Sequence, residues 1–418
     1  MAIPQKIGFL LKTAAVAALG GILFASAPSG QDQAYTLEEV IAIGVERNPR
    51  IAAGALEAAA RESAYKASKR LFNPQFEFRL GRAEYHNRPE DRRTFSLAVA
   101  QPIESPVKRH HRIEIEKSSW EESLQTQAFR TMEVVFDIKL RFYSLLLLQE
   151  REVLLKRIAA SVLDMEHLVR KRAELGEVKH LDAIKLRVEA LKAENELIAL
   201  QAEMEQGREN LNILLDNALA PGFRASGRLD FRPVPMDADA LIDRALAGHP
   251  LIQAGIRQLE QSRHRVLFVK GQRFPDFALT GFNDSGLDGV NRGVGITLAI
   301  PLWNFKSNEL AEAVSLSRVS ERELGAARLE LTRDVRAGVR RVRLAEKTLS
   351  VYTDALLRQV EESLAIAEVS YREGEISLLD FLDSQRTYNS VLGDYHRALF
   401  SWNIEMAALE KAVGAAIQ

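Results

Sequence analysis

Two carboxylates near the C-terminal end carry the most specific chemical prediction in this sequence. Asp380 and Asp383 are three residues apart, so on a helix they share one face and could bind cations together. A structural role is the alternative, because Ser377-x-x-Asp380 resembles a capping box and the helix dipole favours an acid in the first turn. The sequence leaves both interpretations open.

The adjacent pair His110-His111 is the other candidate for chemistry. Neighbouring residues on a helix point about 100° apart, whereas two metal ligands on one helix need the i, i+4 spacing. We therefore expect no metal site at this pair, and no cofactor. Cysteine is absent, which excludes thiolate ligands and disulfides. A phosphate-binding glycine loop, an HExxH helix and a nucleophile elbow are also absent, so we predict a protein that is not an enzyme.

Composition and the N-terminus restrict where the protein works. The chain has 418 residues, 27% of them charged, and a net charge of −1, a balance that disfavours nucleic acid as a partner. Lys6 and Lys12 precede an apolar run over residues 13–24 and the small residues 25–27. This pattern predicts a secretory signal peptide within residues 1–30, with its cleavage site left open. A membrane span would need about 20 apolar residues.

The elements that would position these residues begin with one very long helix. Residues 106–175 start at Ser105-Pro106 and contain no further proline or glycine before Gly176, which predicts a helix roughly 100 Å long. Apolar residues spaced by three and four continue beyond Gly176. We therefore predict a turn at Gly176 and an antiparallel return to about Leu215, with Asp182 close to the turn.

The chain is a duplication. Residues 175–182 match residues 373–380, and the spacing from Pro49 to Pro74 equals that from Pro250 to Pro275. A second proline-free tract runs from about Lys306 into the second turn. The predicted organisation is a first repeat over 35–216, a proline-containing linker over 217–236 and a second repeat over 237–418.

Four short segments alternate between apolar and other residues with the period of a β-strand. They lie near 76–80, 95–99, 277–280 and 294–300. The polar intervals 83–93 and 284–292 are predicted to join them as two hairpins with long loops. The apolar residues predicted to face lipid are Phe76, Phe78, Phe95, Leu97, Val294, Ile296 and Leu298.

The strand count predicts association. No segment after the signal peptide is apolar enough for a transmembrane helix, and an isolated hairpin would leave backbone groups unpaired in lipid. Bacterial barrels need at least eight strands, so four strands per chain require a dimer or a trimer. The alternative is a secreted or periplasmic coiled-coil structural or tethering protein, similar to an adaptor, with exposed hairpins.

The duplicated order of helix, strand hairpin, long helix, glycine turn and returning helix resembles the bacterial outer-membrane efflux proteins of the TolC type. The residues that carry the resemblance lie in 37–49, 101–103 and 371–374, together with Gly176, Asp182 and Asp380. It covers essentially the whole mature chain. Residues 101–109 are similar to the heavy-metal branch of that family.

The resemblance implies a mainly α homotrimer in the outer membrane, with duplicated helical hairpins forming an α-barrel tunnel and four strands per chain building one 12-stranded β-barrel. A short helix over 50–71 would stack end to end with the helix over 177–215, and the linker would lie in a belt around the tunnel. The implied function is a passive exit duct of a tripartite efflux or type I secretion system. The implied partners are outer-membrane lipid, a periplasmic adaptor and an inner-membrane pump, with the RND type favoured.

The same resemblance assigns roles to individual residues. The turns would form the tip on which the adaptor docks, and Asp380 and Asp383 would form a periplasmic gate. Ile376 stands where the family pattern has a basic residue, so the closing ion pair of the pattern is not reproduced here. The residues implied in docking are Gly176, Asp182, Tyr371 and Gly374.

Overall fold

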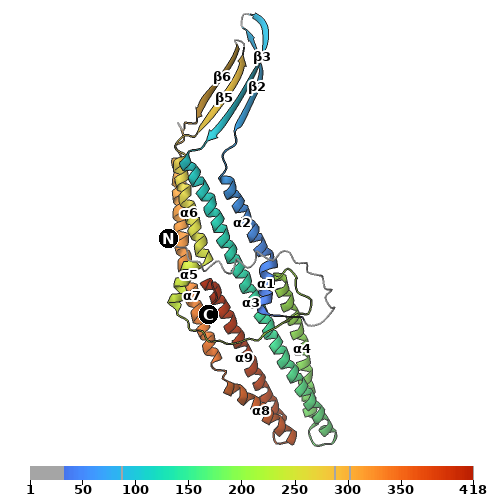
Figure 1. Ribbon diagram of the computed structural model, residues 1–418. Helices are drawn as coiled ribbons and strands as arrows, with labels where there is room; N and C mark the ends of the chain where they lie inside the picture. Colours follow the sequence, from blue (N-terminus) through green and yellow to red (C-terminus); the bar gives the residue numbers. More distant parts are fainter. Residues whose placement is uncertain (1–32, 86–87, 287–288, 301–302, 418) are drawn as a thin grey trace, which may run out of the picture.

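The computed structural model describes residues 33–85, 88–286, 289–300 and 303–417, so the predicted signal peptide lies outside the described residues. The molecule is elongated (Figure 1), with a four-stranded sheet at one end, two helical turns at the other and the short helices near the middle. The predicted mainly α class is confirmed. Among the described residues, no helix combines the length and the apolar character needed to cross a membrane.

The first repeat follows the predicted order. Its longest helix, α3, spans Pro106–Glu174 and is unbroken over 69 residues, with the proline in its first turn. The remaining elements of this repeat are α1 (Leu37–Arg47), α2 (Pro49–Ser68), β2 (Gln75–Tyr85), β3 (Arg88–Ile103) and α4 (His180–Leu214).

The second repeat differs from the first at one place. The tract that starts near Lys306 does not form one helix but breaks over residues 350–353 into α7 and α8. Thr353 begins α8 and accepts a hydrogen bond from the Leu356 amide at 3.2 Å. A threonine followed by an acid is a typical helix start. It is easily overlooked here, because no proline or glycine stands beside it. The elements of this repeat are α5 (Ala238–Gly248), α6 (Pro250–Gly271), β5 (Phe277–Gly286), β6 (Gly289–Leu298), α7 (Ser307–Leu349), α8 (Asp354–Glu373) and α9 (Leu378–Val413).

The four long strands form one antiparallel sheet in the order β2-β3-β5-β6. The prediction of long hairpin loops is wrong, because pairing continues to Tyr85 opposite Arg88 and to Gly286 opposite Gly289. Backbone pairing does not require apolar side chains, and polar strand ends stay hydrated. A short parallel pair, β1 (Ala34–Tyr35) with β4 (Arg224–Ala225), is an additional element that the sequence did not predict.

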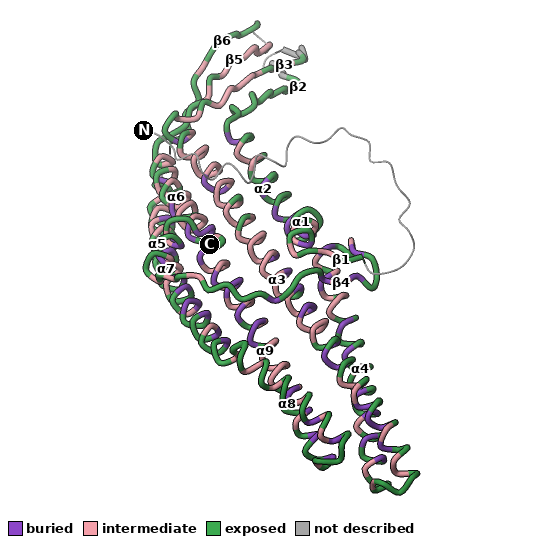
Figure 2. Tube along the Cα trace, turned by 60° about the horizontal axis from the view of Figure 1, so that its bottom comes forward, coloured by how far each residue is buried: buried purple, intermediate pink, exposed green. Residues whose placement is uncertain are grey.

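The helices stack end to end around an apolar core at the middle of the molecule. Asn48, between α1 and α2, donates through Nδ2 to the carbonyl oxygen of Leu214 at the end of α4, at 2.8 Å. The predicted stacking of the short helix on the returning helix is thereby confirmed. In the second repeat His249 Nε2 lies 3.3 Å from the carbonyl oxygen of Lys411. Figure 2 shows buried segments along the helices, whereas the sheet is exposed or intermediate.

The linker over 217–236 lies against this central region. Phe231 packs edge-on against Trp402 of α9, with ring centroids 5.1 Å apart. Arg343 of α7 donates to the Met236 carbonyl oxygen at 2.9 Å. The linker is therefore attached to the second repeat by both apolar and polar contacts. A second apolar cluster lies near the turns and includes Met165, Leu186 and Phe381.

Candidate functional site: sheet, junction and tip

The register of the sheet places all seven predicted apolar residues on one face. Residues directly opposite each other in antiparallel strands share a face, and Phe76, Val99, Gly281 and Val294 follow one another across the four strands. Alternation along each strand then puts the other five on the same side. Val294 is 84% exposed. The face is therefore apolar on the side of the sheet next to the helices, with Asn283 and Arg292 on it farther along, and most of the seven side chains are exposed in the described part of the chain.

The opposite face of the sheet is more polar. Ser96 donates a hydrogen bond to Asp284 across the β3–β5 pair, and the hydroxyls of Thr280 and Thr297 lie 3.4 Å apart. Within the sheet described here, β2 and β6 each pair on one side only. Two open edges and one apolar face are the surfaces that a closed barrel would bury.

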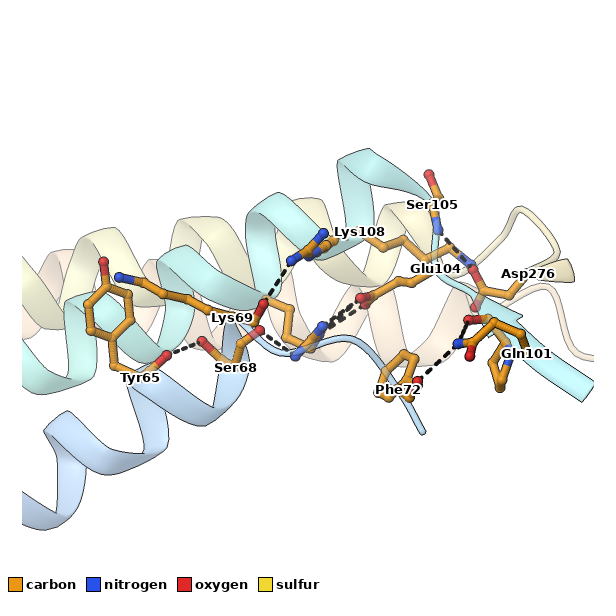
Figure 3. Close-up of polar contacts among 12 residues, drawn as sticks. Tyr65, Ser68, Lys69, Phe72, Gln101, Glu104, Ser105, Lys108 and Asp276 are labelled. Carbon is orange, nitrogen blue, oxygen red and sulfur yellow. Dashed lines mark hydrogen bonds and ion pairs between the residues drawn. The ribbon is translucent and has the colours of Figure 1, made fainter. Parts of the chain in front are cut away.

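A polar cluster joins the sheet to the helices at the start of α3 (Figure 3). The Lys108 side chain is only 5% exposed, and its Nζ donates to the Phe274 carbonyl oxygen at 2.7 Å and ion-pairs with Asp276 at 2.8 Å. Asp276 also accepts from the Ser105 amide at 3.4 Å. These bonds fix the end of α6 and the start of β5 to the first turn of α3.

Two arginines hold the end of α2 in the same way. Arg112 forms a bidentate pair with Glu104, at 2.7 Å between Nη2 and Oε2, and donates to the Ser68 carbonyl oxygen at 2.8 Å. Arg109 donates to the Lys69 carbonyl oxygen at 2.7 Å. This junction is not among the sites predicted from the sequence. Its signal was available, because the dipole disfavours cations in the first turns of a helix, so basic residues there require acceptors from other elements.

Both glycine turns end their helices with the same backbone geometry. Gly176 has φ +78° and Gly374 has φ +81°, a left-handed conformation that glycine adopts without a Cβ clash. The Glu177 amide donates to the Arg172 carbonyl oxygen at 2.9 Å, and the Glu375 amide donates to that of Ser370 at 2.8 Å. Gly374 is the C-cap of α8, and Gly176 directly follows Leu175, the C-cap of α3, so the predicted turn at Gly176 is confirmed.

The two turns meet around one cavity of about 640 Å³, whose lining includes Gly176, Asp182, Tyr371 and Gly374. The Tyr371 ring stacks on Phe381 at 5.5 Å between centroids. Burial, with a smaller contribution from the Asp182 charge, raises the pKa of Tyr371 to about 12. The structure therefore brings together all four residues that the resemblance implicated in docking.

The two aspartates after the second turn have different surroundings. Asp380 completes a capping box with Ser377, whose Oγ donates to its carboxylate at 2.6 Å and accepts from its amide at 3.3 Å. These hydrogen bonds lower the pKa of Asp380. Asp383 is exposed, and among the described residues it has no hydrogen-bond or ion-pair partner. The capping interpretation is thus confirmed for Asp380, while a gate role for either residue stays a prediction.

Comparison with known proteins adds a family and a set of similar folds. The family model described as outer membrane efflux protein matches residues 43–216 and 241–415. The cobalt-zinc-cadmium resistance protein CzcC of Cupriavidus metallidurans is 24% identical over 372 residues, covering 87% of this chain and 88% of that protein.

Solved structures with the same fold include CusC, which has a TM-score of 0.76 at 14% identity over 93% of this chain and 96% of that one. The open state of the MtrE outer membrane channel of Neisseria gonorrhoeae has a TM-score of 0.75 at 16% identity, over 91% of this chain and 89% of that one. At these identities the likeness concerns the fold.

Proposed function

The chain belongs to the outer membrane efflux protein family, a family of outer-membrane channels and not of enzymes, and on that premise we propose that it is a passive exit duct. In this proposal an inner-membrane pump and a periplasmic adaptor deliver the substrate, and the duct conducts it across the periplasm and the outer membrane. The duct needs no catalytic residues, because the pump supplies the energy. Because the chain belongs to this family, we do not retain the alternative of a secreted or periplasmic coiled-coil structural or tethering protein.

The observation that carries the proposal is the sheet, with an apolar face and two open edges, held on a helix of 69 residues. Four strands cannot close a barrel of at least eight strands, so we propose a homotrimer with twelve strands. In it the edge strand β6 of one copy pairs with β2 of the next. The proposed lipid-facing residues are Phe76, Phe78, Phe95, Leu97, Val294, Ile296 and Leu298.

The other end of the molecule would receive the partners. We propose that the adaptor docks on the cavity between the turns, where Asp182 and Tyr371 lie near the two glycines. Trimer symmetry would repeat Asp380 and Asp383 as rings of three carboxylates at the entrance. The division into repeats 35–216 and 237–418, with a linker between them, is part of the same proposal.

For the cargo we propose divalent metal cations. Support comes from the relative named for cobalt, zinc and cadmium resistance, which matches this chain over most of its length, and from the similarity of residues 101–109 to the heavy-metal branch. An RND-type pump, driven by protons, is the favoured inner-membrane partner. The test is export itself, measured as metal accumulation in cells that lack their own duct and carry the pump and adaptor.

The trimer can be tested separately by cross-linking, because the chain contains no cysteine. We would place one cysteine at Glu77 in β2 and a second, in turn, at Gly293, Gly295 or Thr297 in β6. Oxidation of the detergent-solubilised protein should give a covalent trimer for at least one pair. The control pair, with cysteines at Ala98 in the inner strand β3 and at Thr297, should stay uncross-linked. A folded monomer that forms no cross-link with any pair would contradict the barrel.

A further inference from the structure

Three histidines from two helices come together next to the junction. His111 of α3 and His264 of α6 approach with their Nδ1 atoms 3.1 Å apart, although they are 153 residues apart in the sequence. Their ring centroids lie 5.4 Å apart. His110 is also near, with centroid distances of 5.1 Å to His111 and 6.2 Å to His264. The sequence prediction of no metal site considered only the adjacent pair and could not include His264.

The Nδ1–Nδ1 distance fits two arrangements. One is a simple hydrogen bond, in which one ring donates and the other accepts. The other is a shared ion, because zinc–nitrogen bonds of about 2.0–2.1 Å at a tetrahedral angle place two ligand nitrogens about 3.3 Å apart. Burial and the neighbouring His264 and His110 lower the pKa of His111, which favours the neutral imidazole that binds metals.

A third ligand is available on the same helix. His110 and Glu114 have the i, i+4 spacing that puts two ligands on one helical face. The Glu114 side chain is 26% exposed, and its one ion pair among the described residues is with Lys117 at 3.5 Å, so it can reorient at low cost. Within the described ranges, no group of three His, Cys, Asp or Glu side chains is placed to hold a metal ion, so a third side chain would have to reorient to join His111 and His264. The pair is therefore an open site that a third ligand and water would complete.

The electrostatics and the access of the pair are compatible with a cation. On α3, Lys108 pairs with Asp276, Arg109 with the Lys69 carbonyl oxygen and Arg112 with Glu104. On α6, Arg263 and Arg265 flank His264, but neighbouring residues on a helix point about 100° apart, and Arg265 lies over the Phe268 ring. His110 is exposed and lines a cavity of about 590 Å³ between the end of α2 and the start of α3. An ion in this cavity could reach the His110 side of the cluster.

We propose that His111 and His264 bind one divalent transition metal ion of the zinc or cobalt class, with His110 or Glu114 as the third ligand. The site goes beyond the duct function, because a passive conduit needs no resident ion. It stands on the geometry of the α3–α6 contact alone. An ion at this position would tie the two repeats together just below the sheet.

The experiment measures zinc binding to the purified full chain in detergent, prepared without a histidine tag. Isothermal titration with Zn²⁺, and the ligand-field absorption of Co²⁺, should detect one ion per chain. His111→Ala and His264→Ala should each weaken binding by at least tenfold. The matched control is His180→Ala, which removes an exposed histidine at the start of α4 and should leave the affinity unchanged.

Two further measurements keep the result interpretable. His111→Asn keeps a polar side chain at the α3–α6 contact, so it should preserve the circular dichroism and the oligomeric state while it weakens metal binding to the same extent as His111→Ala. Channel conductance in planar bilayers should be unchanged in His264→Ala, because the duct does not depend on the site. The proposal is overturned if the wild-type protein binds no zinc at millimolar concentration, or if His180→Ala weakens binding as much as His264→Ala.

Discussion

Asn48 joins two helices that are far apart in the sequence. Its side-chain oxygen accepts from the Arg50 amide at 2.9 Å as the N-cap of α2, while its side-chain nitrogen donates to the Leu214 carbonyl oxygen at the end of α4, at 2.8 Å. One buried side-chain amide thus provides hydrogen-bond partners for the facing ends of two stacked helices. His249 does the same in the second repeat, where its Nδ1 accepts from the Leu251 amide at 3.2 Å and its Nε2 faces the Lys411 carbonyl oxygen.

Asn48→Ala should destabilise the stacked joint. The change removes a helix cap and takes away the donor to the half-buried Leu214 carbonyl oxygen, so we expect a loss of about 2–3 kcal/mol per chain in the free energy of unfolding. Hydrogen exchange should accelerate at residues 50–53 and 210–216. Thr353→Ala is the control, since it removes only an exposed cap and should cost about 1 kcal/mol. Equal losses in the two variants would refute the shared joint.

Gly374→Trp should abolish export while the trimer still assembles and inserts. The φ of +81° makes any side chain unfavourable there, and an indole would project from the turn into open space, where the adaptor is proposed to dock. Gly222→Trp is a close match, because Gly222 has φ +78° and equally open surroundings but lies in the linker. Export assays of both variants, with trimer content checked on gels, separate docking from backbone strain. Normal export by a Gly374→Trp trimer would exclude docking at this turn.

Asp383→Asn should relieve the block of the channel by multivalent cations. A ring of three exposed carboxylates at a constriction attracts such ions, and Asp383 has no partner within the described chain that would be lost with its charge. Single-channel conductance with and without a trivalent cation measures the effect. Asp394→Asn is the control, because Asp394 is already ion-paired with Arg397. Unchanged block in Asp383→Asn would remove this residue from the pore.

Asp380→Asn should have a second consequence besides any effect on block. Because Asp380 caps α9 through Ser377, its loss should speed hydrogen exchange in the first turn of α9, whereas Asp383→Asn should not. Relief of block together with faster exchange would indicate that Asp380 serves both roles. Faster exchange with unchanged block would indicate a cap alone.

Ile296→Lys should prevent insertion into the outer membrane. A lysine near the middle of the lipid-facing surface costs about 2–4 kcal/mol, and three copies would share the defect. Thr297→Lys is the control, because the neighbouring residue lies on the opposite face of β6 and a charge there would face the barrel interior. Membrane fractionation measures both. Equal insertion of the two variants would show that the apolar face does not contact lipid.

The free energy of unfolding around Tyr371, next to the two glycine turns, should fall as the pH rises from about 10 towards 12. The folded chain holds the Tyr371 pKa at about 12, above the ordinary value of about 10, so the unfolded state releases its proton first and is favoured as the pH rises. Tyr371→Phe keeps the ring that stacks on Phe381 and removes the titration. The difference between the tyrosinate absorbances of the two proteins should show one phenol ionising near pH 12. A phenol that ionises near pH 10 would contradict the buried position.

The sequence was informative where structure follows from local pattern. The helix over 106–174, the two glycine turns and the apolar face of the sheet depend on periodicity and on single residues such as Gly176. The break over 350–353 was missed because Thr353 starts a helix without any proline or glycine beside it. Hairpin lengths were misjudged because backbone pairing extends through polar residues such as Asn283 and Arg292, whose side chains bond at 3.2 Å.

The functional residues could be predicted from the sequence only where their roles depend on nearby residues. Asp380 and the turn residues lie within a few positions of a recognisable signal, so their local roles could be anticipated. The bonds of Lys108 and the approach of His264 to His111 join α3 to elements more than 150 residues away. A single sequence contains both partners of such a contact but no sign that they meet.

The break between α7 and α8 gives the two repeats different mechanical properties. The helix α3 passes the middle of the molecule as one rod, whereas α8 is a separate arm of 20 residues. At 1.5 Å per residue this arm is about 30 Å long, so a swing of about 10° at residues 350–353 would move its far end by roughly 5 Å. In a trimer, three unbroken α3 helices would alternate with three α8 helices that can tilt at residues 350–353. Widening of the entrance would then concentrate at three joints, where the amides of Val351 and Tyr352 bond three residues back and not four.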